Sequence, residues 1–295
     1  MLVLLGLAVS AGIVGVFLVL RKMTMLANSL SHTILLGIVI AFILSHTNSG
    51  NHEPVNLAAM LIASLVMGVT TTYLTEFLTK TVKLQEDASI GIVFTGLFAV
   101  GIILITLATR DAHIGTEIVM GNIDSLHLAD VKLIIILAVI NIVLVALFFK
   151  EYTITTFDPG LAKVLGISPL FFNYLLMTQV SATAIGAFRA VGVLMVLAFI
   201  TGPVLAARLL THDLKKLIGY AILLGCLTSL IAVAISRHIL SVHGIPLSTA
   251  GIAVCVIALL YLAVWSIRKY KRTLRTIRTL KTPTHNQLKG NQTKP

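Results

Sequence analysis

Two side chains that can bind a metal ion, Asn28 and His32, lie four residues apart in a stretch that reads NSLSHTILLG. On a helix, residues at this spacing share one face and lie about 5–6 Å apart at Cβ. An imidazole nitrogen and an amide oxygen can then reach a common point beside the helix. Polar groups inside a membrane are costly and usually face a partner or a cavity. The pair therefore predicts either a metal contact or a hydrogen-bonded contact between helices.

The chain that positions this pair is too apolar for a soluble domain. Of its 295 residues, 57% are hydrophobic and only 11% are charged, whereas soluble domains carry about 25% charged residues. A helix that crosses a membrane needs about 20 apolar residues. The sequence predicts an all-α, polytopic membrane protein with eight or nine such helices. The region 170–209 is interrupted by Gly186, Gly192 and Gly202-Pro203. The expected spans lie near 1–20, 24–45, 55–78, 88–108, 131–149, 170–188, 190–209, 216–236 and 246–267.

The distribution of Lys and Arg indicates the orientation of these spans, because cytoplasmic loops carry an excess of both. With the C-terminus in the cytoplasm, alternating spans place 18 of the 22 Lys and Arg residues on the inner side, Arg21 and Lys22 among them. We therefore expect a transmembrane domain over 1–267 in the cell (inner) membrane. Residues 268–295 are expected to form a basic cytoplasmic tail that is partly disordered.

A polar elbow interrupts the apolar chain at residues 150–169, on the predicted inner side. Asp158 followed by Pro159 is typical of a helix start, with an N-cap acceptor before Pro at the first helical position. Gly166 fits as the end of this short helix. The elbow is either a capped turn between two spans or a contact surface for a cytoplasmic protein. Ala162 is small enough to let such a partner approach closely.

Four stretches in this order resemble the membrane-spanning subunit of ATP-binding-cassette (ABC) importers for zinc, manganese and iron. They are RKMTMLANSLSHTILLGI (21–38), EDASIGIVFTGLFAVGIILI (86–105), FDPGLAKVLGIS (157–168) and AVGVLMVLAFITGPVLAARLL (190–210). The resemblance covers the chain up to about residue 267. It implies two permease subunits that form one pathway, two ATPase subunits below them and a metal-binding protein outside the cell. It also implies a permease fold with no permanently bound cofactor, in which ATP acts only through the partner.

The resemblance also implies roles for individual residues. The second span of the family usually carries Asp, three residues and then His as metal contacts; His32 matches this pattern, whereas Asn28 departs from it. Two Asn side chains would bring no charge to a divalent ion, which favours a heterodimer in which a sister permease supplies the Asp. Residues 157–168 correspond to the coupling helix that rests on the ATPase, with Asp158, Ala162 and Gly166 in it.

Two further positions, Asp87 and Asn122, match family residues. We interpret Asp87 first as a helix N-cap and second as a pathway residue, while Asn122 either caps a short helix or contacts cargo.

The sequence contains no G-x-x-x-x-G-K-[ST] segment, the loop that cradles nucleotide phosphates. The resemblance implies a permease for Mn, Fe or Zn, and the missing loop agrees with a chain that is not itself an enzyme, so that ATP hydrolysis is expected in a partner subunit. The alternative is a stand-alone transporter driven by an ion or proton gradient, which would place ionisable groups in mid-membrane. A membrane enzyme with a bound metal would need three protein ligands held together.

Overall fold

The computed structural model describes residues 1–48, 57–108, 128–244 and 248–281. Within these ranges the chain is helical and has no strand. Nine of the helices are 18 to 33 residues long, and two short ones, α7 and α8, follow α6. The long helices are α1 (Leu2–Leu20), α2 (Thr24–Asn48), α3 (Leu57–Lys80), α4 (Glu86–Ala108), α6 (Leu128–Leu147), α9 (Pro169–Val191), α10 (Val193–Leu210), α11 (Leu214–His243) and α12 (Thr249–Lys281).

The predicted fold class is confirmed, because each of the nine expected spans coincides with one long helix in the described part of the chain. Six of these helices are long and apolar enough to cross a membrane, and α10 contains a shorter apolar stretch, Met195–Leu210. α12 continues without a break to Lys281. The predicted boundary between spans and tail at residues 267 and 268 therefore lies inside a helix.

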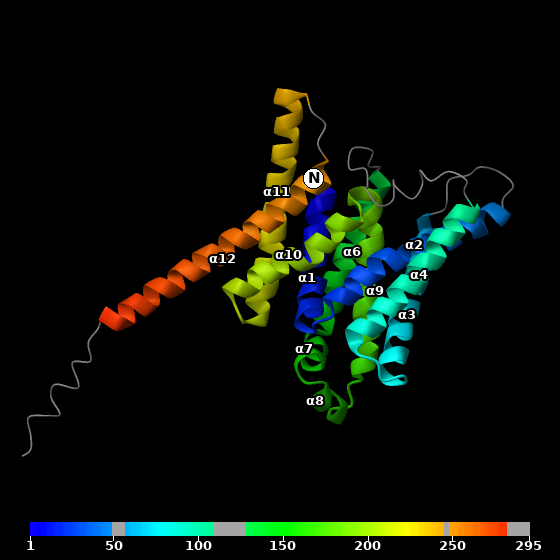
Figure 1. Ribbon diagram of the computed structural model, residues 1–295, viewed down its shortest axis with the longest axis horizontal. Helices are drawn as coiled ribbons and strands as arrows, with labels where there is room; N and C mark the ends of the chain where they lie inside the picture. The colour runs from blue at the N-terminus through cyan, green and yellow to red at the C-terminus, as the bar shows by residue number, and fades with distance from the viewer. Residues whose placement is uncertain (49–56, 109–127, 245–247, 282–295) are drawn as a thin grey trace, which may run out of the picture.

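The first helix, α1, runs through the centre of the molecule (Figure 1). It packs against α6, α9, α10 and α11, and 14 of its 19 residues are buried. Gly15 permits one of these contacts, because a Cβ atom there would collide with the backbone oxygen of Ile200 in α10. The central helix thus depends on a small residue at its closest crossing.

A buried polar cluster ties α1 to two neighbouring helices. The amide nitrogen of Asn141 in α6 donates to the hydroxyls of Ser10 in α1 (2.5 Å) and Thr183 in α9 (2.8 Å). The two hydroxyls are themselves 3.0 Å apart. All three side chains are buried, so their hydrogen bonds satisfy groups that would be costly to leave unpaired in an apolar interior.

Helices α2, α3 and α4 form a group on one side of α1, and α10, α11 and α12 gather on the other (Figure 1). In the first group, the hydroxyl of Thr71 in α3 lies 3.0 Å from that of Thr33 in α2. Both threonines are buried, so this hydrogen bond fixes the rotation of α2 against α3.

The interruption expected near residues 170–209 is a single break between α9 and α10. Gly192 separates the two helices with φ = 77°, a conformation that favours glycine. Pro203 lies within α10 without ending it. Gly186 and Gly202 instead permit close packing, because a Cβ atom would meet Leu137 and Ile257 respectively. A glycine at each of these two positions therefore lets α9 and α10 pack closely against their neighbours.

Candidate functional site

His32 belongs to α2, and its side chain faces the neighbouring helix α4. Its ring contacts Phe94 and Phe98, with centroid distances of 5.2 and 5.5 Å. The two phenylalanines stack on each other at 5.8 Å. His32 remains half-buried. The aromatic pair therefore supports one side of the imidazole and leaves part of it open at the surface of this single chain.

Asn28 lies one helical turn before His32 and is also half-buried. The four-residue spacing within α2 places both side chains on one face of the helix, as the sequence predicted. The intervening Ser29 and Leu30 are buried and lie on the side that packs into the molecule. α2 thus presents an imidazole and an amide together on its less buried face.

The chain offers these two groups without a complete metal site of its own. In the ranges that the structure describes, no three His, Cys, Asp or Glu side chains lie close enough to hold an ion together. An imidazole and an amide are two potential ligands for a passing divalent cation. The role of His32 and Asn28 as metal contacts stays a prediction.

The two further positions have different outcomes. Asp87 is exposed and lies in the first turn of α4, which begins at Glu86, so the N-cap interpretation is wrong. From the first turn its carboxylate still complements the positive end of the helix dipole. Asn122 lies outside the described residues.

The polar elbow folds into α7 (Phe149–Phe157) and α8 (Pro159–Val164), which lie at one end of the molecule, here called the α8 end (Figure 1). The carboxylate of Asp158 accepts a hydrogen bond from the backbone N–H of Leu161 at 2.9 Å, and Pro159 is the first helical residue. The predicted helix start is confirmed.

The predicted helix end at Gly166 is also confirmed. Gly166 has φ = 76°, and its N–H donates to the carbonyl of Lys163 at 3.1 Å. The N–H of Ile167 donates to the carbonyl of Ala162 at 2.9 Å. This pair of bonds is the Schellman arrangement, which satisfies the last carbonyls of the helix.

The prediction for Ala162 is wrong. Its side chain is fully buried against the rest of the chain, so no partner can approach over it. The exposed side of the elbow is formed by large apolar residues instead: Phe157 (62% exposed), Leu161, Val164 (84% exposed) and Leu165. A surface available to a partner therefore exists on α8, but on the opposite face from the one predicted.

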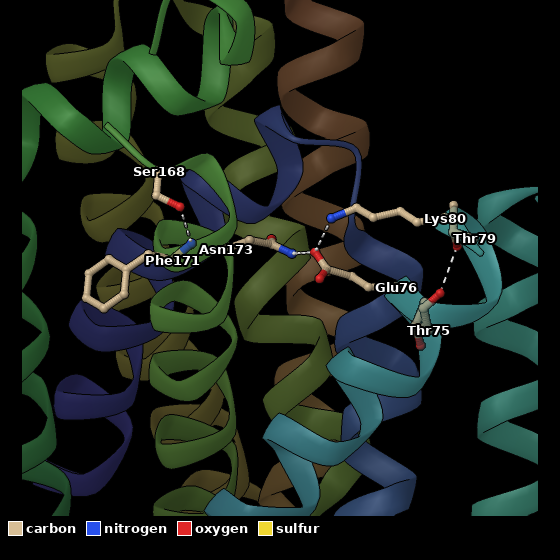
Figure 2. Close-up of polar contacts among 7 residues, drawn as sticks. All are labelled: Thr75, Glu76, Thr79, Lys80, Ser168, Phe171 and Asn173. Atoms are coloured by element: carbon tan, nitrogen blue, oxygen red, sulfur yellow. Dashed lines mark hydrogen bonds and ion pairs between the residues drawn. The ribbon is translucent and has the colours of Figure 1, made fainter. Parts of the chain in front are cut away.

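An aromatic cluster anchors α7 to the long helices α1 and α9. Tyr152 in α7 packs between Phe17 and Phe172, with ring centroids 5.1 and 5.4 Å away. Its hydroxyl donates to Oε1 of Gln179 in α9 at 2.7 Å. Ser168 caps α9 two residues after Gly166, accepting from the N–H of Phe171 (Figure 2). The end of α8 and the start of α9 are therefore separated by only the four residues 165–168.

A second link at the α8 end joins α9 to α3. The carboxylate of Glu76 accepts from the amide of Asn173 at 3.0 Å and pairs with Lys80 at 3.4 Å (Figure 2). No motif in the sequence singles out Tyr152, Glu76 or Asn173. A tyrosine inside a polar elbow and an acidic residue near a span end were the available signals, but neither specifies a partner far along the chain.

A comparison with known proteins identifies the family of this chain. The family model for the ABC 3 transport family matches residues 1–268. The chain belongs to this family. The resemblance found in the four sequence stretches is thereby confirmed, and the match ends where the predicted basic tail begins.

The chain is also similar to individual proteins of known sequence or structure. A protein of Chlamydia muridarum named "Probable metal transport system membrane protein" is 40% identical over 88% of this chain and 81% of its own length. The manganese transport system membrane protein MntD of Bacillus subtilis is 34% identical over 90% of this chain and 92% of its own length. The solved structure of PsaBC from Streptococcus pneumoniae in complex with Fab is 25% identical, with a TM-score of 0.75 over 90% of this chain and 88% of that one.

Proposed function

We propose that this chain is the membrane-spanning subunit of an ABC importer that moves a divalent transition metal, Mn, Fe or Zn, into the cytoplasm. The observation that carries the proposal is the family match over residues 1–268, which includes all nine long helices up to the end of the spanning part of α12. Two relatives of similar length have names that describe metal or manganese transport.

In this proposal, the metal passes along the face of α2 that presents Asn28 and His32. A second permease subunit packs opposite and supplies further ligands. Two Asn28 amides would contribute no negative charge, so a sister permease that carries a carboxylate at this position completes the pathway in a heterodimer. Few ligands suit an ion in transit, since an ion that is held too tightly cannot leave.

The driving force enters through α8. The exposed apolar side chains of Leu161, Val164 and Leu165 dock on a cytoplasmic ATPase subunit, while a metal-binding protein delivers the ion on the other side. ATP acts only in that partner, and this chain holds no permanent cofactor. The C-terminus and the α8 end lie in the cytoplasm. Closure of the ATPases moves α8, and α9 transmits the movement to α3 through Asn173 and Glu76, so that access alternates between the two sides.

Metal accumulation with and without the ATPase tests this function. Cells that express the permease with its neighbouring ATPase should take up labelled manganese, iron or zinc faster than cells without the permease. Uptake should fall to that background when the ATPase gene is deleted. Uptake that continues unchanged without the ATPase would contradict the proposal and indicate a transporter driven by an ion gradient.

A further inference from the structure

A pocket of about 720 Å³ opens at the α8 end, between the ends of α1 and α3 and the segment from α7 to α9. Three cationic side chains, Arg21, Lys80 and Lys163, line it together with one carboxylate, Glu76. The pocket therefore has an excess of two positive charges. Neither the proposed metal pathway on α2 nor the proposed docking face of α8 uses it.

Arg21 is the most buried of the three cations. Its Nε and Nη2 atoms donate to the hydroxyls of Thr156 (3.0 Å) and Thr155 (2.8 Å) in α7. Among the described residues it forms no ion pair. Burial lowers the pKa of Arg21 to about 10, so the guanidinium is still charged at neutral pH. Two threonine hydroxyls hold this charge in place but do not neutralise it, and an arginine has five N–H donors in total.

The carboxylate in the pocket does not neutralise Arg21 either. Glu76 pairs with Lys80 at 3.4 Å and accepts from Asn173 at 3.0 Å (Figure 2). Lys163, in the last turn of α8, is exposed and has no ion pair among the described residues. Two cations, Arg21 and Lys163, thus face one pocket without a counter-charge.

The position of the pocket along the helices suits a phosphate at the membrane surface. Arg21 directly follows the last residue of α1, and Lys80 is the last residue of α3. In the proposed membrane topology the pocket lies where these helices leave the membrane, and apolar residues, Met23, Pro169 and Leu170, line it beside the charged ones. Basic pockets between membrane helices are typical binding sites for anionic lipid headgroups.

We propose that this pocket binds a phosphate group, with the Arg21 guanidinium and the Lys163 ammonium as its cationic ligands. The fork of an arginine matches the oxygens of a phosphate, and a lysine adds a point charge. The phosphate belongs either to an anionic phospholipid of the adjacent leaflet or to a soluble phosphate compound. The site would fasten α7 and α8 to the membrane surface beside the region that the ATPase is proposed to contact.

Ligand binding to the purified full chain in detergent tests the site. Native mass spectrometry would follow titration with phosphatidylglycerol and, for comparison, with zwitterionic phosphatidylcholine. Inorganic phosphate would be titrated separately and followed by ³¹P line broadening. The variants are Lys163→Ala, whose side chain is exposed, and Arg21→Lys, which keeps the charge but loses the fork. Lys150→Ala is the matched control, because Lys150 is an exposed lysine of the same end outside the pocket.

We expect wild type to bind phosphatidylglycerol more tightly than phosphatidylcholine, and Lys163→Ala to lose about fivefold in affinity, the effect of removing one basic residue near an anionic headgroup. Arg21→Lys should also bind phosphatidylglycerol more weakly than wild type, because a lysine cannot offer the forked donors that match a phosphate. Lys150→Ala should bind as wild type does. If the pocket variants weaken the binding of phosphatidylglycerol but not of inorganic phosphate, the site belongs to a lipid. If they weaken the binding of inorganic phosphate but not of phosphatidylglycerol, it belongs to a soluble phosphate compound.

Three results would overturn the proposal. The first is unchanged binding of both ligands in Lys163→Ala and Arg21→Lys. The second is an equal loss in Lys150→Ala, which would indicate a diffuse basic surface. The third is a Lys163→Ala variant that retains less ATPase during purification while its phosphate and lipid binding stay intact, because the cation would then serve an acidic side chain of the partner.

Discussion

His32 combines two properties that suit contact with an ion in passage. Its ring is supported by Phe94 and Phe98, which limits its rotation, and it is only half-buried. A positioned imidazole loses little freedom when an ion arrives, whereas a fully buried one could not be reached. Asn28 contributes an oxygen from the same helix face without adding charge. In the proposed pathway the two side chains together favour weak and reversible coordination.

Replacing Asn28 with Asp should keep or raise the amount of metal retained by the purified permease, because a carboxylate adds a negative charge beside His32. Metal content after equilibration with Mn, Fe or Zn and desalting can be measured by mass spectrometry. The control is Gln85→Glu, which adds the same charge at an exposed position before α4. A clear loss of metal in Asn28→Asp would argue against a ligand role for this position.

Tyr152 has a structural role that can be tested separately. Burial raises the pKa of its hydroxyl, so the group is a neutral donor at neutral pH, and it bonds to the buried Gln179. Tyr152→Phe leaves that amide oxygen without its donor and should lower the free energy of unfolding by about 1–3 kcal/mol. Thermal unfolding in detergent would show this as a lower midpoint.

Tyr220→Phe provides the matched control, because Tyr220 is 40% exposed. It should leave the unfolding midpoint unchanged. Equal midpoints for Tyr152→Phe and wild type would mean that water replaces the lost hydrogen bond.

At the scale of elements, α8 is a six-residue helix that depends on its ends. An isolated helix of this length is not stable, and Asp158 and Gly166 supply its cap and its stop. Both ends were predictable because caps depend on residues within one turn. The buried face was not, since Ala162 points inwards only because α7 and α9 determine how α8 sits against them. Local sequence therefore predicted the helix but placed its contact surface on the wrong side.

Asp158→Ala should destabilise α8 by about 1 kcal/mol through loss of its cap. We expect less ATPase to copurify with this variant, at unchanged amounts of permease in the membrane. Asp213→Ala is the control, because Asp213 occupies the N-cap position of α11 without a capping hydrogen bond from its side chain. Equal ATPase retention in Asp158→Ala and wild type would show that docking does not depend on the cap.

The crossing of α1 and α10 gives a second prediction at this scale. Gly15→Ala would place a methyl group against the backbone oxygen of Ile200, which cannot move without shifting α10. Overpacking of this kind typically costs about 1–3 kcal/mol, so the unfolding midpoint in detergent should fall. Gly219→Ala in α11, where an added Cβ meets no atom within 4 Å, should not lower it. A wild-type midpoint for Gly15→Ala would contradict the close crossing.

At the scale of the whole molecule, the sequence predicted which segments are helices but not how they are arranged. Hydropathy cannot distinguish a helix buried in protein from one that faces lipid, since both surroundings are apolar. α1 and α12 are both apolar enough to span a membrane, yet 78% of the span of α1 is buried, against 17% of that of α12. The central position of α1 follows instead from small and polar residues, Ser10 and Gly15, that match partners more than 130 residues away.

The same limit explains the candidate site. The four-residue spacing of Asn28 and His32 places them on one face, whatever the tertiary structure. His32 is supported by Phe94 and Phe98 in α4, more than 60 positions later in the chain, and nothing near His32 specifies these two residues. The link from α8 through Asn173 to Glu76 in α3 is likewise set by packing at a distance.

The most direct test of the account is ATP-dependent uptake of labelled manganese, iron or zinc by vesicles that contain the complete transporter. His32→Ala is compared with His212→Ala, an exposed histidine between α10 and α11. We predict that His32→Ala lowers the uptake rate at least tenfold with normal membrane insertion and ATPase retention, the loss expected when about 1.4 kcal/mol of favourable ion contact is removed. His212→Ala should transport at the wild-type rate. Wild-type transport of all three metals by His32→Ala would contradict the central claim that α2 carries the ion past this imidazole.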